Sequence, residues 1–493
     1  MRGFLTSSIG ISSIGVSSVG VTCAAALALP LTVPAAAAPA RPADGRAVES
    51  AVPGATQSLP LVPLARGRAR AAAPEPGLHR DHVRHFSLLG VVWDDPGTEL
   101  RGRVQVRTRA AGTGRWSGWQ DLETHTADHG ADPGAAERAP GRVRGATAPL
   151  WVGDSDGVDV RVRADDRDGG EGHRGGGRAG GAGGRGPAGG TGAPLPSGLR
   201  LELVDPGDAP PPGDEPPPAD AGPGDEPPPA GPQADLPGTV TLSEAEAAAS
   251  AVNTDLGPFA ATEIPALGRA DTEMQLLALR GDQLTDAQRG KPHIGPRPRI
   301  VTRLGWHADE SLREKGFVYT KKIKAAFVHH TASGNNYRCS QAPSVIRGIY
   351  RYHVRSMGWR DIGYNFLVDK CGTLYEGRAG GVSKAVRGAH TLGFNTDSMG
   401  VAVIGSYGSS KPSSAAVKAV AQLAAWKLGL YGGDPRGKTY LKSGGGNLYP
   451  KGKNVRLNVI SGHRDGYATD CPGKRLYAKL GSVRSTAARY QGR

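Results

Sequence analysis

The sequence predicts an α/β domain, with a mixed central β-sheet flanked by helices, in the C-terminal part of the chain and a separate, small all-β domain before it. Strand-like segments alternate with helical ones after residue 296, which is typical of α/β folds. Between residues 86 and 205, apolar and polar residues instead alternate with a period of two, the pattern of half-buried strands. All 13 tyrosines fall between Tyr319 and Tyr490. We therefore expect the best-packed domain in the last third of the chain.

The composition excludes a single compact domain. The 493 residues include 74 Gly and 39 Pro, roughly twice the average usage, and only 38% are hydrophobic. The net charge of +14 favours an anionic partner, such as nucleic acid, an acidic membrane surface or an acidic cell-wall polymer. No motif combines aromatic and basic residues as nucleic-acid binding requires, so we expect no nucleic-acid partner.

The N-terminus resembles a secretory signal peptide. Met1 and Arg2 precede a long stretch of small and apolar residues, and a run of small residues follows at 35–40. The alternative is a retained membrane anchor, but Gly and Ser dilute the apolar stretch below that of a good spanning helix. We assign residues 1–40 to the signal, which removes Cys23, and expect a secreted, cell-wall-associated protein without stable membrane insertion.

The segments before residue 206 differ in pattern. Residues 41–80 are rich in Ala, Arg and Pro without periodicity and are expected to form a flexible lead. Residues 81–205 are expected to form the all-β domain, a sandwich, interrupted by a Gly-rich insertion at 168–192 that cannot fold by itself. Trp116 and Trp119 are expected to pack in its core; the alternative is a face that stacks on carbohydrate.

Two connecting segments precede the C-terminal domain. Residues 206–237 are acidic and Pro-rich with a near repeat, and polyproline geometry gives them a reach on the order of 90 Å, so they are expected to separate two units that work at a distance. Residues 238–295 are expected to be a helical or disordered connector. The α/β domain spans residues 296–488.

The C-terminal domain contains strand patterns that alternate with two helix patterns. A helix is expected after Ser340 and Pro343, and a second at 413–428, which Gly429 ends. Residues 400–406 are nearly continuous in apolar residues and should be buried on both faces. The strands are expected at 323–330, 364–369, 373–377, 400–406 and 457–465.

Two histidines and a cysteine at or just past strand ends could bind a metal. His329, His463 and Cys471 would give a tetrahedral zinc ion three ligands and leave one position open, the arrangement of a catalytic site. Zinc lowers the pKa of bound water to about 7 and polarises a carbonyl. His330 competes with His329, since adjacent strand residues point to opposite faces, and the residues alone leave that choice open.

Cysteine arithmetic supports a metal site. Three cysteines remain after removal of the signal, an odd number for an oxidising compartment, so one pair plus one thiol with another role is the simplest assignment. Cys339 and Cys371 would then form a disulfide. The alternative is that all three cysteines bind metal.

Four ordered blocks resemble a known family: FVHHTASG (327–334), GWRDIGYNFLVDKCGTLYEGR (358–378), GAHTLGFNTDSMGVAVIGS (388–406) and GHRDGYATDCPG (462–473). They resemble the zinc-dependent N-acetylmuramoyl-L-alanine amidases, which share a fold with the peptidoglycan recognition proteins. The resemblance implies zinc at His329, His463 and Cys471, and so favours His329 over His330. It also implies that Tyr364 and Thr469 are catalytic and stabilise the oxyanion.

The same resemblance implies a substrate groove. His353 matches a groove histidine, although its place on an apolar helix face is equally consistent with a core role. Arg378 matches an arginine that pairs with the extra carboxylate of diaminopimelic acid, which a guanidinium can bind with two hydrogen bonds. Asn395 lies in the groove or caps a loop. The expected substrate-binding residues are His353, Gly358, Trp359, Arg378, His390 and Asn395.

These features predict a monomeric zinc hydrolase. It would cleave the amide bond between N-acetylmuramic acid and the L-alanine of peptidoglycan stem peptides, in cell-wall turnover or lysis. The alternative is a non-catalytic peptidoglycan-binding recognition protein. Such proteins usually lack the zinc cysteine, and Cys471 is present here.

Overall fold

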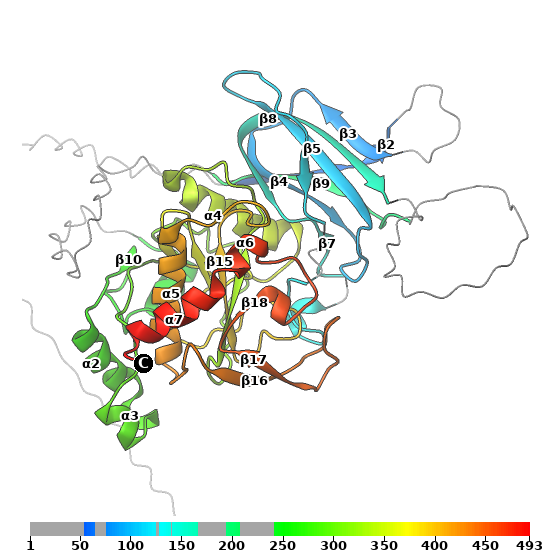
Figure 1. Cartoon of the computed structure of the whole chain (residues 1–493). Coiled ribbons are helices and arrows are strands. Elements are labelled where there is room, and N and C mark those ends of the chain that lie inside the picture. Colours follow the sequence, from blue (N-terminus) through cyan, green and yellow to red (C-terminus); the bar gives the residue numbers. More distant parts are fainter. Residues whose placement is uncertain (1–53, 65–74, 125–127, 140, 166–193, 208–240) are drawn as a thin grey trace, which may run out of the picture. The chain divides into compact units, whose positions relative to one another are not determined.

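In the computed structural model (Figure 1), the described residues belong to one compact unit. The predicted signal peptide with Cys23, the Gly-rich insertion and nearly all of the Pro-rich linker lie outside the described residues. Within the described part of the chain, no helix is both long and apolar enough to cross a membrane. The structure describes residues 54–64, 75–124, 128–139, 141–165, 194–207 and 241–493.

The N-terminal half is all β, as predicted. Its described strands pair in the order β1-β9-β4-β8-β3-β2, while β5 joins β8 and β6, and β7 joins β4. A short 3-10 helix, η1 (Ala136–Arg138), lies between β6 and β7. The strands are β1 (Ala55–Pro60), β2 (Val62–Pro63), β3 (Pro76–Arg80), β4 (Phe86–Trp93), β5 (Gly102–Ala110), β6 (Gln120–Leu122), β7 (Gly145–Ala146), β8 (Leu150–Ala164) and β9 (Arg200–Asp205).

The flexible lead predicted for residues 41–80 is wrong where the structure describes it. β1 pairs with β9 over six residues, and β3 pairs with β8. β1 is an end strand of the pairing order and has few apolar residues, so its sequence shows no apolar–polar alternation. Backbone hydrogen bonds hold it in the sheet instead.

Trp116 and Trp119 also depart from their predicted place in the core. Trp119 is 36% exposed, and the guanidinium of Arg161 lies 4.1 Å from its ring centroid. Arg107 lies within 5.2 Å of the Trp116 ring centroid. The two indoles lie on the surface. Arginine side chains stack on their faces and partly cover them, so the indoles pack against arginines and not in the apolar core.

The C-terminal half contains a mixed seven-stranded sheet, as predicted. Among the described residues its order is β10-β11-β14-β13-β15-β12-β18, and β12 runs parallel to both β15 and β18. A hairpin of β16 (Lys438–Lys442) and β17 (Asn454–Asn458) forms a separate two-stranded sheet. The strands of the central sheet are β10 (Glu263–Ile264), β11 (Ile300–Val301), β12 (Ala325–His330), β13 (Phe366–Val368), β14 (Leu374–Glu376), β15 (Ser398–Val403) and β18 (Ile460–Gly462).

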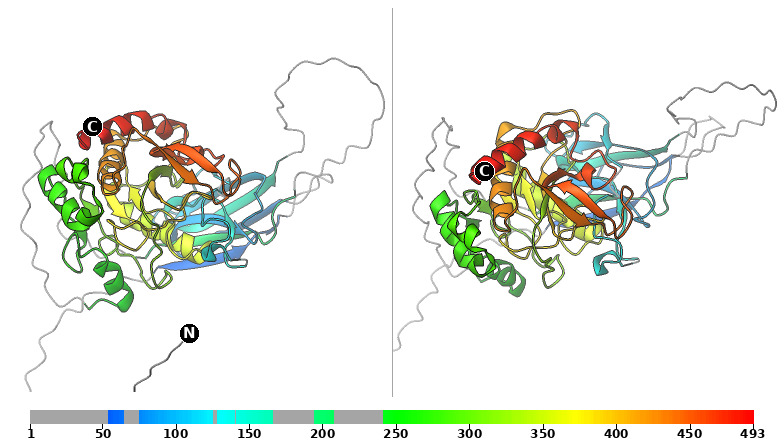
Figure 2. Two further views of the ribbon diagram at one scale, coloured as in Figure 1. Left: turned by 90° about the horizontal axis from the view of Figure 1, so that it is seen from below. Right: turned by 60° about the horizontal axis from the view of Figure 1, so that its bottom comes forward.

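Helices cover this sheet. α5 and α7 lie side by side, as the views in Figures 1 and 2 agree, and both contribute to one core with the strands. α4 carries Ile346 and Ile349 into a second core. The helices are α1 (Glu244–Ala251), α2 (Arg269–Arg280), η2 (Gly281–Gln283), α3 (Asp286–Gly290), η3 (Cys339–Gln341), α4 (Ala342–Arg351), the π-helical η4 (Tyr352–Ser356), α5 (Ser414–Gly429), η5 (His463–Asp465), α6 (Lys474–Tyr477) and α7 (Leu480–Tyr490).

The connector predicted at 238–295 belongs to the C-terminal domain. Its helical content is as expected, but β10 pairs with β11 of the central sheet, and Leu276 joins the core beneath α5 and α7. The amide of Asn253 donates to the buried carboxylate of Glu376 at 3.0 Å. The domain therefore begins near residue 241, well before the predicted boundary at 296.

The two halves share a core and are not held apart. β4 is buried on both faces: Leu89 and Val91 pack in the core of the N-terminal sheet, while Leu88 and Val92 pack with residues of α4. The hydroxyl of Tyr352 donates to the carbonyl of Thr147 at 3.1 Å. The prediction that residues 206–237 separate two units that work at a distance is therefore wrong, because the two halves pack together.

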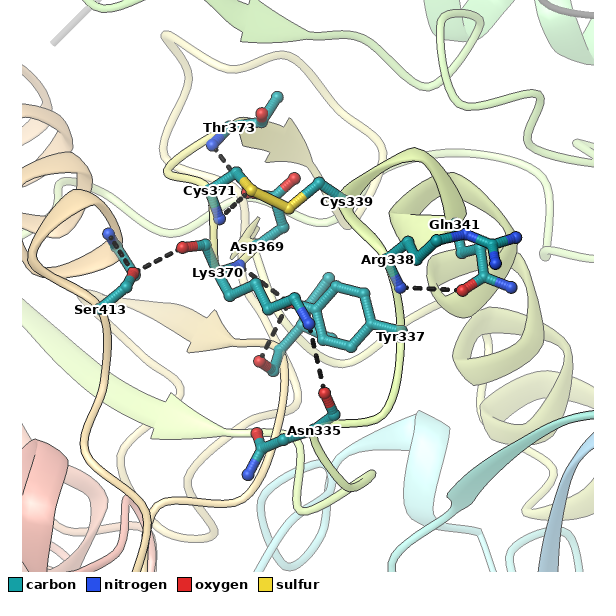
Figure 3. The surroundings of a disulfide bond; sticks show 12 residues. Asn335, Tyr337, Arg338, Cys339, Gln341, Asp369, Lys370, Cys371, Thr373 and Ser413 are labelled. Atoms are coloured by element: carbon teal, nitrogen blue, oxygen red, sulfur yellow. Dashed lines mark hydrogen bonds between the residues drawn. A yellow bond between two sulfur atoms is a disulfide. The ribbon is translucent and has the colours of Figure 1, made fainter. Parts of the chain in front are cut away.

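Cys339 and Cys371 form the predicted disulfide, which joins the start of η3 to the turn between β13 and β14 (Figure 3). Asp369 accepts hydrogen bonds from the backbone N–H groups of Cys371 and Thr373, both at 2.9 Å. The turn is therefore fixed independently of the sulfur atoms.

Replacing both cysteines with serine should lower stability without changing the fold. The bond closes a loop with a sequence separation of 32, so we expect a loss of about 3–4 kcal/mol in the free energy of unfolding. Urea unfolding of the Cys339→Ser/Cys371→Ser protein measures the loss. Equal unfolding midpoints for the two proteins would contradict a stabilising role.

Candidate active site

Parallel pairing of β12 with β18 brings two of the predicted metal ligands together. Val328 lies opposite Gly462, so the next residues, His329 and His463, follow at the same edge of the sheet. Their ring centroids are 4.5 Å apart. The Sγ atom of Cys471 lies 3.7 Å from Nδ1 of His329. His329, His463 and Cys471 are all buried.

A fourth potential ligand comes from the N-terminal half. His129, His329, His463 and Cys471 each offer one ligand atom, and these four atoms lie within 4.8 Å of one another. His129 belongs to the β6–β7 segment, by which we mean residues 128–138. Sequence reasoning missed it, because a single histidine in an irregular loop carries no periodic or spacing signal.

The polar atoms of this cluster fit a metal ion. Nε2 of His129 and Nδ1 of His463 are buried without a hydrogen-bond partner, which is costly unless another group, such as a cation, binds them. Burial lowers the pKa of His463 to about 3 and holds the pKa of His329 well below its usual value, so both rings are neutral, the form that binds metal. Imidazole and thiolate ligands suit zinc.

His330 lies outside the ligand cluster. It is buried with Nε2 3.7 Å from a carboxylate oxygen of Glu123, and its Nδ1 accepts from the backbone N–H of Tyr407 at 3.3 Å. Burial raises the pKa of Glu123 to about 7. Glu123 and His330 line one pocket with Tyr364, and sequence reasoning did not single out Glu123.

His390 is placed differently from the groove position predicted for it. It is completely buried, and its Nδ1 lies 3.2 Å from Nε2 of His329. The hydroxyls of Thr391 and Ser398 lie 3.0 and 3.3 Å from its two ring nitrogens. Nδ1 of His329 is the atom that faces Cys471, so His390 contacts the other ring nitrogen and orients the His329 ring.

The two residues predicted to be catalytic border the cluster. Tyr364 is buried, and its ring centroid lies 5.5 Å from that of His329. Burial, with the nearby Cys471 and Asp128, raises the pKa of Tyr364 well above its usual value, so the phenol keeps its proton. Thr469 is half-buried, and its Oγ1 accepts from the backbone N–H of Cys471 at 3.1 Å.

Arg378 is buried and paired. It donates to Glu137 of the β6–β7 segment with two hydrogen bonds, of 2.7 and 3.0 Å, and through Nε to the carbonyl of Ile362 at 2.9 Å. Burial opposes ionisation of both groups, but the guanidinium lowers the pKa of Glu137. The arginine predicted to bind a substrate carboxylate thus binds one from its own chain.

Asn395 caps a loop, one of the two roles predicted for it as alternatives. Its Oδ1 accepts from the backbone N–H groups of His390 and Thr391 at 2.7 and 3.1 Å, which caps the loop. Its Nδ2 donates to Asp132 at 2.7 Å and to the carbonyl of Gly130 at 2.9 Å. It therefore fixes the loop and contacts the β6–β7 segment.

One group of neighbouring residues predicted to bind substrate consists of His353, Gly358 and Trp359. The rings of His353 and Trp359 are 4.4 Å apart, and Nδ1 of His353 accepts from the backbone N–H of Gly363 at 3.2 Å. Gly358 has a φ of 77°, and a Cβ there would lie 2.1 Å from the carbonyl oxygen of Arg142. Only glycine fits at that position.

In comparisons with known proteins, the two halves of the chain match different families. The N-acetylmuramoyl-L-alanine amidase family matches residues 319–474, and the family described as Rv3811 N-terminal galactose-binding domain-like matches residues 40–186. Peptidoglycan-recognition protein SC2 of Drosophila simulans is 31% identical over 37% of this chain and 84% of its own length. A human N-acetylmuramoyl-L-alanine amidase is 31% identical over 42% of this chain and 31% of its own. Among solved structures, Drosophila PGRP-LB is 26% identical with a TM-score of 0.29, over 37% of this chain and 92% of its own.

Replacing His390 with alanine should weaken zinc binding about 10- to 100-fold, because His329 would lose the partner that orients its ring. Competition with a chromogenic chelator measures the affinity. The matched control is His85→Ala, which removes an exposed histidine bonded to Asp154 in the N-terminal sheet. Unchanged zinc affinity in His390→Ala would contradict the orienting role.

Proposed function

The chain belongs to the family of N-acetylmuramoyl-L-alanine amidases and peptidoglycan-recognition proteins, and we propose on that premise that it is a secreted zinc hydrolase that cleaves the amide bond between N-acetylmuramic acid and L-alanine of peptidoglycan. The observation that carries the proposal is the set of three ligand groups, His329, His463 and Cys471, beside a buried tyrosine. A recognition function requires no such set.

In the proposed reaction, each residue of the site would have a distinct role. His329, His463 and Cys471 would hold the zinc ion, and His390 would keep His329 in orientation. Bound zinc supplies Lewis-acid chemistry at the amide carbonyl and a water of lowered pKa. Tyr364, whose phenol keeps its proton, would donate a hydrogen bond to the oxygen on which negative charge develops. The Thr469 hydroxyl would act as a second, neutral donor.

The substrate side of the proposal rests on Arg378. Its guanidinium already binds a carboxylate in bidentate fashion, which supports the recognition of a stem peptide that carries an extra carboxylate, as diaminopimelic acid does. Trp359 and His353 would contact the glycopeptide near the cluster. The partner proposed for the whole chain is peptidoglycan, bound by a monomer outside the cell.

The competing function is peptidoglycan recognition without cleavage. The matched relatives include proteins named for recognition, so the fold alone does not choose between the two. Cys471 favours the enzyme, because zinc binding gives a role to a buried thiol that lies beside His463, whose Nδ1 has no hydrogen-bond partner.

Replacing Cys471 with alanine should abolish amide cleavage, because zinc would lose its thiolate ligand. The zinc-loaded full chain is expected to release stem peptides with a free alanine amino group from purified sacculi, and EDTA should stop the release. Mass spectrometry of the fragments identifies the bond that is cut. Undiminished release by the Cys471→Ala protein would rule out the proposed mechanism.

Replacing Arg378 with alanine should reduce selectivity between stem peptides. The full chain is expected to cut diaminopimelic acid stems with a higher kcat/KM than lysine stems, and Arg378→Ala should bring the ratio towards one, because the bidentate carboxylate contact is lost. The ratio is informative even if the substitution changes the absolute rate. Equal rates of the unaltered chain on both substrates would refute this specificity.

A further inference from the structure

The β6–β7 segment contacts the groups that the proposed function assigns to metal and substrate. It reaches them from the N-terminal half, where it lies between the strands β6 and β7. Three independent sets of contacts bear on its role, and they involve the metal cluster, the arginine and the loop around Asn395.

The first set closes the metal site. Two imidazoles and a thiolate leave zinc one position for water or substrate, whereas four protein ligands make a closed, structural type of site. His129 is the fourth group of the cluster, and its buried Nε2 has no other partner. Its Nδ1 lies 2.9 Å from the carboxylate of Asp128, the usual arrangement for orienting a metal-binding histidine.

The second set fills the carboxylate subsite. Glu137 is 5% exposed and lies against Arg378 with both oxygens engaged. Its Oε1 also accepts from the backbone N–H of Arg360 at 3.3 Å. A substrate carboxylate therefore cannot reach Arg378 until Glu137 leaves.

The third set resembles a bound peptide. The backbone N–H of Gly130 donates to the carbonyl of Ala389 at 3.1 Å, and the N–H of Leu392 donates to the carbonyl of Asp128 at 2.9 Å. Asp132 accepts from Asn395 and from the N–H of Gly393, at 2.7 and 2.8 Å. Gly130 also lies against Trp359, where a Cβ would be 3.6 Å from the indole ring.

We propose that the β6–β7 segment occupies the substrate groove and that His129 is a fourth ligand of the metal, so that the full chain folds as a latent enzyme. The proposal rests on the proposed function for the identity of the groove and the metal. The packing of the two halves does not itself require these contacts, since Leu88 and Val92 join them through an apolar core. Any cleavage by the unaltered chain would then come from the small population in which the segment has left.

The metal part of the proposal is tested without activity. Full-length protein is loaded with Co²⁺, and the visible absorption bands report the ligands. His129→Ala is expected to change the Co²⁺ spectrum and to weaken Zn²⁺ binding at least about tenfold, while His85→Ala changes neither. A spectrum and an affinity equal to those of the unaltered chain would overturn the assignment of His129 as a ligand.

The groove part is tested by binding to zinc-free protein, which cannot hydrolyse the probe. The probe is a muramyl tripeptide with diaminopimelic acid, measured by calorimetry. Asp132→Ala/Glu137→Ala is expected to bind it at least tenfold more tightly than the unaltered chain, and Asp121→Asn, an exposed carboxylate in the N-terminal sheet, equally tightly. Glu137→Gln, which keeps the shape of the side chain, should give a smaller gain in the same direction and covers the case in which the double variant does not fold.

The two proposals fail differently. Unchanged or weaker binding of the tripeptide by folded Glu137→Gln or the double variant would overturn occupancy of the groove, whether or not the zinc-loaded chain cleaves sacculi. Tighter binding with no cleavage by any zinc-loaded variant would support occupancy and refute the amidase. Tighter binding together with at least tenfold faster cleavage by the zinc-loaded His129→Ala/Glu137→Gln chain would support both.

Discussion

The candidate site depends on the parallel register between β12 and β18. That register places the histidines that follow Val328 and Gly462 next to each other, and β12 can hold it only while Ala326 and Val328 pack in the core beneath α5 and α7. A slip by one residue would turn His329 towards that core and His330 towards Cys471. The apolar contacts of helices far from the chemistry therefore decide which imidazole reaches the metal cluster.

Polar groups in the site are satisfied across the boundary between the two halves. Arg378 has its carboxylate from Glu137, Asn395 has its acceptor from Asp132, and the candidate metal cluster has its fourth ligand atom from His129. Each of these groups is buried or nearly so, and an unpaired buried charge is far costlier than an exposed one. These paired polar contacts explain why the β6–β7 segment, an irregular stretch of backbone, can be held in a groove without a strand or a long helix of its own.

Sequence patterns predicted most elements of the C-terminal domain and a candidate set of metal ligands, because periodicity and cysteine count are local signals, while the choice of His329 over His330 came from the family resemblance. Periodicity located β12, β15 and α5, and the odd cysteine identified Cys471 as different from the disulfide pair. The patterns failed where tertiary contacts decide. β1 is held by pairing with β9, Trp119 is covered by arginines, and His390 supports His329 from behind. The β6–β7 segment escaped notice, since nothing in eleven irregular residues signals that they lie in another domain's groove.

The burial of β4 on both faces has a consequence for how the chain reaches its native state. Synthesis delivers β4 long before α4, yet the face of β4 that carries Leu88 and Val92 packs against residues of α4. The N-terminal sheet therefore exposes Leu88 and Val92 until the C-terminal half has been made and has folded against it. The two halves are coupled in folding order, and recombination that exchanged the C-terminal half for an unrelated domain would leave an apolar, aggregation-prone sheet face behind.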